Sequence, residues 1–472
     1  MRVRTMAMLV GAGLLAAAAA GAAIAFSPQT AAEVAAGLDA HSVCSAVFVQ
    51  GLDGPATHRE MVRMLTGPVG ALLRHKVDRS GRGVDAAFAG LVHARADFTP
   101  GYGCRLRNAA NIPLPALPPA PAPAPDAFAP LYEVATRDPA LAAAIDRVFA
   151  ERPGAPLKQV KAVVVVKDGH VVAERYAPGF GVETPLISYS VAKSFTNALL
   201  AVLVRQGRLS VTQPVGAPEW AATGDPRAKL TVEDLLRMQS GLDAREDDSA
   251  TSPVAQMEFV AGAAADMAAF AARHPAKEPP GQRFEYTSAN TIILDRLLGQ
   301  TIGGGPAGFR GFAEREVFAP LHMSNVTLEF DGAGTFVGST WVYAPARDFA
   351  RFGQLFLNDG IAPDGRRVLP QGWVAWSRRS TLGAPYGAGF WTNDGPDPLA
   401  AQRVAAGFPK DGFYASGNLG QRIYIVPSQR LVVVRFGYSA PPSFGIADDI
   451  ALIKAAVAAT SQAEDLTSLL IG

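Results

Sequence analysis

The chain has 472 residues, 49% of them hydrophobic and 8% aromatic, which is enough to build a packed core and excludes global disorder. Its 43 Lys and Arg residues are balanced by 42 Asp and Glu residues, and no block of like charge stands out. Nucleic-acid-binding proteins ordinarily carry a basic patch or a strongly basic balance, so we exclude nucleic acid as a partner. The length suits either two or three domains or one large enzyme domain with an appendage.

The first 26 residues have the pattern of an export signal. Arg2 and Arg4 precede an uncharged apolar run over residues 5–26, with a small-residue cleavage site, Ala-Ile-Ala, at 23–25. The run is also close to the ~20 residues that span a bilayer, so a retained membrane anchor is the alternative to a cleaved signal. We therefore expect a protein that is exported, either periplasmic or attached to the membrane and facing the periplasm or exterior.

Residues 27–107 indicate a small segment of mixed structure, helical around 59–74 and extended around 91–98. Both cysteines of the chain, Cys44 and Cys104, lie in it. An even pair in an exported protein indicates a disulfide, here closing a loop of about sixty residues and worth roughly 4 kcal/mol in a chain-entropy estimate. The seven histidines are scattered without a metal-binding spacing, so we expect no metal and no cofactor.

A proline-rich stretch follows this segment. Residues 113–130 read PLPALPPAPAPAPDAFAP, a composition that sustains neither a helix nor a central strand. We interpret residues 108–130 as an extended linker between the segment 27–107 and a second domain over 131–472.

The second domain has the pattern of a mixed α/β fold. Residues 161–176 predict a β-hairpin around an Asp-Gly turn, and residues 422–438 predict another around Pro-Ser. Helical patterns dominate between the two hairpins. Strands at both ends of the domain indicate one antiparallel sheet flanked by helices, with an inserted all-helical lobe at about 205–345.

The chain contains one S-x-x-K motif, which runs from Ser190 to Lys193 and begins an apolar helix. Three residues are nearly one helical turn, so the lysine ammonium should lie over the serine hydroxyl. The helix N-terminus favours negative charge there, and burial lowers the pKa of a lysine until it can act as a base. The alternative is an ordinary N-cap serine with a lysine one turn later.

This motif resembles the nucleophile motif of class C β-lactamases, DD-peptidases and their relatives. Three later segments resemble that family in the same order: LLRMQSGL at 235–242, GQRFEYTS at 281–288 and ARDFARFG at 346–353. The first departs from the usual His-Thr at Met238 and Gln239. The resemblance covers about residues 131–465 and implies a β-lactamase/transpeptidase-like fold, with Ser190 as nucleophile and Lys193 as its activating base.

The resemblance also implies a catalytic role for Tyr286, which would move a proton between the serine and the leaving group. The alternative is a packing tyrosine whose hydroxyl binds the backbone. Many class C enzymes have Asn two positions after this tyrosine, where this chain has Ser288. A serine can still donate a hydrogen bond to a substrate, whereas Asn290 should face elsewhere on a helix.

The third family element is usually Lys-Thr-Gly or His-Thr-Gly on a strand beside the nucleophile. The matching stretch reads GFYASGNLGQ, in which Ser416 and Gly417 take the Thr-Gly place and Ala415 replaces the basic residue. The N–H groups of Asn418 and Ser190 would form the oxyanion hole. The alternative is a plain turn before the hairpin. Trp391 is expected either in the substrate cleft or in the core.

The missing basic residue bears on the substrate. In the family, this Lys or His helps to hold the carboxylate of a β-lactam or a peptidoglycan stem. Because Ala415 stands in its place, β-lactamase activity is not expected. The third element resembles that of 6-aminohexanoate-dimer hydrolases and esterases of this fold. We therefore expect a serine hydrolase that cleaves an ester or amide bond of a small molecule through an acyl-enzyme. A DD-peptidase or β-lactamase is the alternative, and a non-catalytic cell-envelope binding protein is the second alternative.

Overall fold

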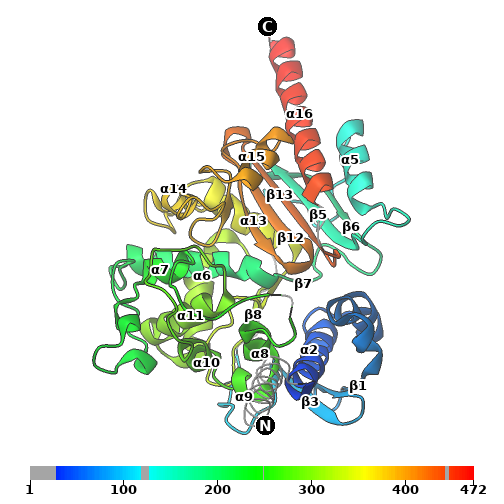
Figure 1. The fold of residues 1–472 in the computed structure, drawn as a ribbon. Coiled ribbons are helices and arrows are strands. Elements are labelled where there is room, and N and C mark those ends of the chain that lie inside the picture. The colour runs from blue at the N-terminus through cyan, green and yellow to red at the C-terminus, as the bar shows by residue number, and fades with distance from the viewer. Residues whose placement is uncertain (1–27, 118–126, 248, 442–445, 472) are drawn as a thin grey trace, which may run out of the picture.

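The computed structural model of the chain describes residues 28–117, 127–247, 249–441 and 446–471 (Figure 1). The run over residues 1–26 that was expected to direct export lies outside these residues. Within the described ranges, no helix has both the length and the apolar character needed to cross a membrane.

The centre of the fold is a six-stranded sheet of order β10-β11-β12-β13-β5-β6, in which all neighbours are antiparallel. Its strands are β5 Val160–Lys167, β6 His170–Tyr176, β10 Trp391–Thr392, β11 Phe413–Gly417, β12 Gln421–Val426 and β13 Leu431–Gly437. The two predicted hairpins meet at its centre, where Val164 of β5 pairs with Val434 of β13. The prediction of one antiparallel sheet built from both ends of the domain is confirmed.

The first hairpin forms because its two turn residues both tolerate a left-handed backbone. Asp168 has φ 50° and Gly169 has φ 84°, as in the two-residue turns whose twist matches that of the flanking strands. Strand β5 is an almost uninterrupted buried apolar run, which is the pattern of a strand covered on both faces, whereas the edge strand β6 also carries polar and partly exposed residues.

Helices cover the two faces of this sheet. Val164 and Val166 share a core with helix α13 (Ala346–Leu357). The alternating residues Val163 and Val165 share a second core with α5 and α16. The helices α5 and α16 run over Pro139–Phe149 and Ile446–Ile471 (Figure 1).

A mainly helical lobe is inserted between the two hairpins. Its helices, with the nucleophile helix that precedes it, are α6 Ala192–Arg205, α7 Val232–Leu236, α8 Pro253–Phe259, α9 Ala261–Ala264, α10 Met267–Ala272, α11 Ser288–Ile302 and α12 Gly305–Ala313. Short helices α14 (Trp373–Ser377) and α15 (Pro398–Ala405) follow α13.

The range 205–345, expected to be all-helical, also holds two short strands, β8 (Thr327–Leu328) and β9 (Val342–Ala344). Together with β7 (Leu186–Ile187) they form a three-stranded sheet of order β7-β9-β8. Because β7 lies immediately before the nucleophile turn, this pairing ties the end of the lobe to the catalytic segment.

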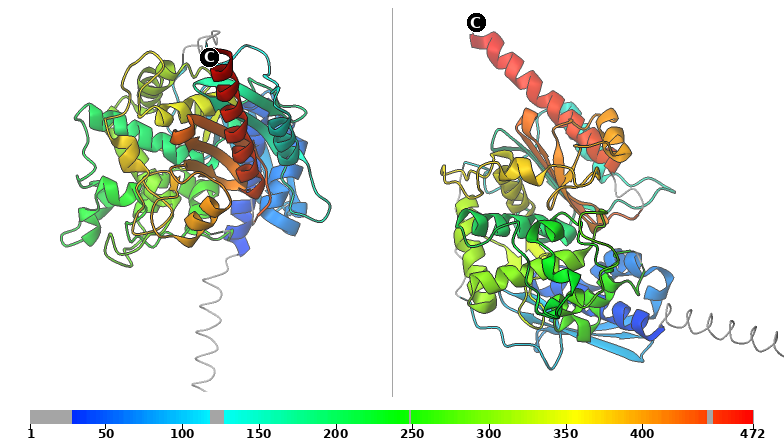
Figure 2. Two further views of the ribbon diagram at one scale, coloured as in Figure 1. Left: turned by 90° about the horizontal axis from the view of Figure 1, so that it is seen from above. Right: turned by 60° about the vertical axis from the view of Figure 1, so that its left-hand side comes forward.

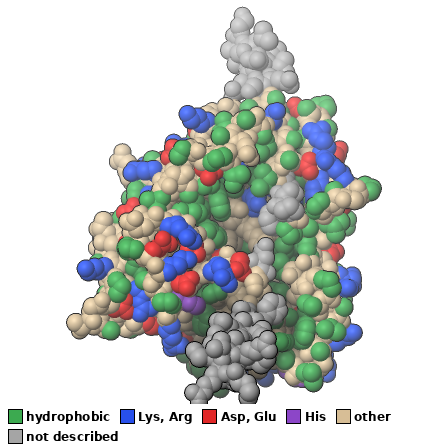
Figure 3. Space-filling view, viewed as in Figure 1, with side chains coloured by type: hydrophobic (Ala, Val, Ile, Leu, Met, Phe, Trp, Pro, Cys, Tyr) green, Lys and Arg blue, Asp and Glu red, His purple; other side chains and the backbone are tan. Residues whose placement is uncertain are grey.

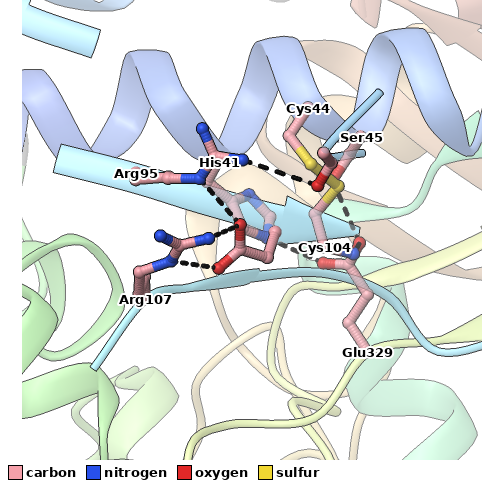
Figure 4. The surroundings of a disulfide bond; sticks show 9 residues. His41, Cys44, Ser45, Arg95, Cys104, Arg107 and Glu329 are labelled. Carbon is pink, nitrogen blue, oxygen red and sulfur yellow. Dashed lines mark hydrogen bonds and ion pairs between the residues drawn. A yellow bond between two sulfur atoms is a disulfide. The ribbon is translucent and has the colours of Figure 1, made fainter. Parts of the chain in front are cut away.

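The N-terminal unit, residues 28–107, packs one long helix on a small sheet. Helix α2 (Pro28–Phe48) lies against an antiparallel sheet of order β1-β2-β3-β4. The remaining elements are α3 Gly54–Thr57, the π-helical turn η1 His58–Val62, α4 Arg63–Thr66, η2 Gly67–Leu72, β1 Leu73–Asp78, β2 Gly83–Phe88, β3 Val92–Thr99 and β4 Gly103–Leu106. In the structure a disulfide joins Cys44 of α2 to Cys104 of β4 (Figure 4).

The N-terminal unit is docked on the rest of the protein and lies alongside the helical lobe (Figure 2). Its buried side chains belong to the same hydrophobic core as the sheet and the lobe. A fully buried carboxylate, Glu329, adds a polar anchor: it binds His41 Nε2 at 2.8 Å, Ser45 Oγ at 3.0 Å and the backbone N of Cys104 at 2.8 Å (Figure 4). The described part of the linker, residues 108–117 and 127–130, contains no helix. The shared core and the Glu329 hydrogen bonds join the two parts in addition to the linker.

Candidate active site

The nucleophile candidate Ser190 lies in a short 3-10 turn, η3 (Tyr189–Val191), that leads directly into α6. The preceding residue, Tyr189, has a left-handed backbone with φ 42°, which is unusual for a residue that is not glycine. The Tyr189 side chain is buried, and its hydroxyl donates to Met61 Sδ of the N-terminal unit at 3.0 Å. Such a conformation persists only where its surroundings hold it, and here it leaves Ser190 partly exposed at the helix N-terminus.

Lys193 is 2% exposed, and its Nζ has three hydrogen-bond partners. These are Ser190 Oγ at 2.9 Å, Ser288 Oγ at 2.9 Å and the Ser339 carbonyl oxygen at 3.0 Å. A carbonyl oxygen can only accept, so one N–H points at Ser339. A neutral amine with its second N–H on Ser288 directs its lone pair at the Ser190 hydroxyl, which is the geometry of a general base.

Burial lowers the pKa of Lys193, because the ammonium loses its hydration more than the neutral amine does. Three acidic side chains, Glu246, Glu258 and Asp295, oppose this effect on the pKa but do not overcome it. The neutral amine is therefore more accessible near neutral pH than it is for a lysine in water.

Tyr286 lies close to the nucleophile, and interaction of its hydroxyl with the Ser190 side chain lowers its pKa in part. Its ring centroid is 4.9 Å from Lys193 Nζ. Burial raises the pKa of Tyr286 well above its ordinary value, and the nearby charge of Glu246 raises it further. At neutral pH the side chain is thus a phenol that can donate a proton.

Two aromatic side chains support Tyr286. Tyr386 and Trp391 have ring centroids 5.5 Å and 5.7 Å from that of Tyr286. Trp391 begins the short strand β10, pairs with Tyr414 of β11 and remains partly exposed. It packs on the core and its ring also contacts that of the candidate catalytic tyrosine, while a place in the substrate cleft stays a prediction.

The end of β11 closes the site opposite Lys193. A Cβ added to Gly417 would lie 2.3 Å from the Ser188 carbonyl oxygen and 3.1 Å from the backbone N of Ser190. Gly417 has φ −124°, an ordinary extended value, so this position needs glycine for space rather than for backbone freedom. Ser416 is partly exposed on one side of it, and Asn418 is exposed on the other.

Ser288 is 2% exposed and is the first residue of α11. Its hydroxyl accepts a hydrogen bond from Lys193 Nζ at 2.9 Å, and the hydrogen bond that it could donate to a substrate stays a prediction. The backbone N of Ser288 donates to Glu246 Oε2 at 2.5 Å, which places a carboxylate at the N-terminus of α11, where the helix dipole favours it. Asn290 faces away from the site, as expected, and its Oδ1 accepts from Ser240 at 2.8 Å.

Three residues near Lys193 were missed by reasoning from sequence. Ser339 contributes only a backbone carbonyl, for which no side-chain motif exists. Glu246 follows the SGL segment within a few residues, a position that a spacing argument could have found. Glu258 lies on α8, is 7% exposed and accepts from Thr340 Oγ1 at 2.5 Å, and burial raises its pKa to about 7.

Comparisons with known proteins show which proteins the chain is similar to. A family model described as "Beta-lactamase" matches residues 145–458. A 6-aminohexanoate-dimer hydrolase of Paenarthrobacter ureafaciens is 30% identical over 224 residues, an alignment that covers 45% of this chain and 55% of that protein. The chain therefore matches only about half the length of this curated relative.

Solved structures share the fold at low sequence identity. A candidate 6-aminohexanoate-dimer hydrolase from Bacillus anthracis superposes with a TM-score of 0.56 at 22% identity, covering 72% of this chain and 89% of that one. A candidate β-lactamase from Bacteroides dorei superposes with a TM-score of 0.51 at 18% identity, covering 67% and 96%. The fold, the ordered motifs and the family match lead to one conclusion: the chain belongs to the beta-lactamase family of hydrolases.

Proposed function

We propose that this protein is a serine hydrolase that cleaves an ester or amide bond of a small molecule through an acyl-enzyme on Ser190. The observation that carries the proposal is the 2.9 Å contact between Lys193 Nζ and Ser190 Oγ. In the neutral amine, the two N–H groups of Lys193 are directed at Ser288 and the Ser339 carbonyl, which leaves the lone pair for the Ser190 hydroxyl. The lysine is therefore held in one orientation toward the serine.

In the first half-reaction Ser190 Oγ attacks the substrate carbonyl while Lys193 accepts the hydroxyl proton. The developing oxyanion accepts hydrogen bonds from the backbone N–H groups of Ser190 and Asn418, each such donor being worth roughly 3–4 kcal/mol. Tyr286 donates its proton to the leaving alcohol or amine and is reprotonated from Lys193. The products are an acyl-Ser190 ester and the free leaving group.

In the second half-reaction a water molecule attacks the acyl-Ser190 carbonyl and loses a proton to the Tyr286–Lys193 pair. Collapse of the tetrahedral intermediate breaks the bond to Ser190 Oγ, which regains a proton and releases the acid. The same groups thus act in both directions.

The substrate class follows from the strand beside the nucleophile. Ala415, in the place of the family's basic residue, is 1% exposed and offers no charge to a substrate carboxylate. Arg422 on β12 does not replace it, because its Nη1 binds the backbone carbonyls of Gly417 at 2.8 Å and Gln421 at 2.7 Å and the side chain is 4% exposed. Esters and linear amides, whose carbonyl needs only the oxyanion donors, are the better fit, and the relative from Paenarthrobacter is named for a linear amide.

A substrate panel tests this proposal with the protein lacking residues 1–26 and its Ser190→Ala variant. We expect hydrolysis of p-nitrophenyl esters or of the 6-aminohexanoate dimer by the unmodified protein alone, with a transient acyl adduct on Ser190 by mass spectrometry. Rapid nitrocefin turnover without ester cleavage would instead identify a β-lactamase. Stable labelling by a fluorescent penicillin would identify a DD-peptidase, and no reaction in any assay would favour the binding protein.

We also propose that the protein acts outside the cytoplasm. The basic-apolar pattern of residues 1–26 and the disulfide between Cys44 and Cys104 both support an oxidising compartment. Mass spectrometry of the protein from fractionated cells tests this. A chain starting after residue 25 in the periplasmic fraction indicates a cleaved signal, an intact chain in the membrane fraction indicates an anchor, and an intact chain in the cytoplasm contradicts export.

A further inference from the structure

Three potential metal ligands meet in the N-terminal unit, at a place that plays no part in the serine mechanism. Asp39 lies in the middle of α2, His58 begins the π-helical turn η1, and His75 lies on β1. His58 Nδ1 is 2.8 Å from Asp39 Oδ1, and His75 Nδ1 is 3.4 Å from Asp39 Oδ2. One ligand atom from each residue lies within 4.8 Å of the other two.

We propose that Asp39, His58 and His75 bind one divalent first-row transition-metal ion, with Zn²⁺ as the representative probe. Imidazole nitrogen and carboxylate oxygen are ligands that Zn²⁺ takes at about 2.0–2.2 Å. Two such ligands at a tetrahedral angle are about 3.3–3.5 Å apart. The observed 2.8 and 3.4 Å separations therefore need only a small opening of the cluster to admit the ion.

The burial of Asp39 and the incomplete hydrogen bonding of its carboxylate are the second observation that points to a ligand. Its side chain is 0% exposed, and its Oδ2 makes no hydrogen bond to any described residue. A buried carboxylate ordinarily has a full set of hydrogen bonds, a cationic partner or a metal ion. Among the residues that the structure describes, the ion pairs of Asp39 are those to His58 and His75, and no Lys or Arg of that part of the chain supplies the missing charge.

A hydrogen-bonded His-Asp-His network without metal is the competing explanation. It accounts for the short contact of Oδ1 with His58 but leaves Oδ2 at 3.4 Å from His75 without a hydrogen bond. Both histidine side chains are 13% exposed, which leaves the cluster open to solvent for ion entry and for a water molecule as a fourth ligand. The π-helical turn at His58 adds to this, because such turns recur at functional sites.

The site would tie three separate elements of the N-terminal unit together. It joins α2, η1 and β1, and the same η1 turn carries Met61, which contacts Tyr189 beside the nucleophile at 3.0 Å. Glu60 of the same turn pairs with Lys161 of β5 at 2.6 Å. A bound ion would therefore stabilise the turn through which the N-terminal unit touches the catalytic segment.

The test uses the full chain without an affinity tag, freed of metal with a chelator and titrated with Zn²⁺ by calorimetry. We expect one ion per chain, micromolar or tighter affinity, and a rise of a few degrees in Tm at saturating Zn²⁺. Asp39→Asn and His58→Gln should each weaken Zn²⁺ binding at least tenfold, an order-of-magnitude estimate for loss of one ligand. His93→Gln, an exposed histidine on β3 of the same unit, is the matched control and should bind as the unmodified protein does.

Two results would overturn the proposal. The first is an unmodified protein that binds no Zn²⁺ below millimolar concentration, a result that does not depend on any variant folding. The second is Zn²⁺ binding that is unchanged in His58→Gln and in a further variant, His75→Gln. Visible absorption of bound Co²⁺ provides an independent readout, because tetrahedral coordination gives intense bands that should be lost in either histidine variant.

Discussion

Replacing Ser288 with alanine removes one of the three hydrogen-bond partners of Lys193 and leaves the nucleophile untouched. Ser288 Oγ lies 2.9 Å from Lys193 Nζ and is 2% exposed, so water does not easily take its place. Because Lys193 gains a proton as Ser190 attacks, this hydrogen bond is stronger in the transition state than in the ground state.

The expected size of the effect follows from that difference in charge. A hydrogen bond to a neutral group is worth about 1 kcal/mol and one to a charged group about 1.5–3 kcal/mol. The difference, about 0.5–2 kcal/mol, is lost only in the transition state and corresponds to a roughly 2- to 30-fold fall in kcat/KM. The ammonium loses more than the amine, so the pKa of Lys193, already lowered by burial, should fall further.

The assay is the pH dependence of kcat/KM on the best ester of the panel. The acid limb of this profile should move to lower pH in Ser288→Ala, because the free base of Lys193 is then populated at lower pH. Ser240→Ala is the matched control, since Ser240 is buried in the same lobe and bonds Asn290 at 2.8 Å. The control should lose stability without moving the limb. Wild-type kcat/KM with an unmoved limb in Ser288→Ala would refute the role assigned to this hydrogen bond.

Three further outcomes are expected. The pKa of Glu258 is about 7 in the folded state against an ordinary value of 4.5, so the folded state binds more protons between these two pH values. The contribution of Glu258 to the free energy of unfolding is therefore full below pH 4.5 and is lost as the pH rises through about 7. Glu258→Gln should flatten this loss, by up to about 3 kcal/mol, in urea unfolding at about pH 5 and about pH 8; an unchanged pH dependence contradicts the assignment. Gly417→Ala places a Cβ 2.3 Å from the Ser188 carbonyl and should reduce kcat by about 100-fold while Tm falls by only a few degrees, and wild-type kcat would show that β11 does not define the site. Removing the disulfide with Cys44→Ala and Cys104→Ala should lower the free energy of unfolding by roughly 2–5 kcal/mol, whereas an unchanged urea midpoint would show that the bridge is not a stabilising link.

Features with a local signature could be predicted from the amino-acid sequence. The hairpin at 161–176 follows from two apolar runs around Asp168-Gly169, and both turn residues adopt the positive φ that such a turn needs. The contact between Ser190 and Lys193 follows from helical spacing, which brings residues three apart to one side of a turn. The family resemblance, carried by motifs in order, then indicated the fold and placed Tyr286 beside the serine.

Contacts between residues far apart in the chain were decided only by tertiary structure. Ser339 supplies a carbonyl to Lys193, and a backbone oxygen has no sequence signature at all. The contact of Ser288 with Lys193 depends on where α11 begins and how it packs on α6.

In the N-terminal unit, too, one feature could be predicted from the sequence and another was decided only by the tertiary structure. Its two cysteines could be paired by counting, because the chain offers only one combination. The cluster of Asp39, His58 and His75 could not be found that way, since its members come from a helix, a π-helical turn and a strand without a metal-binding spacing. Sequence periodicity reports which face of an element is buried, whereas the partner of a buried polar group is set by how separate elements pack in three dimensions.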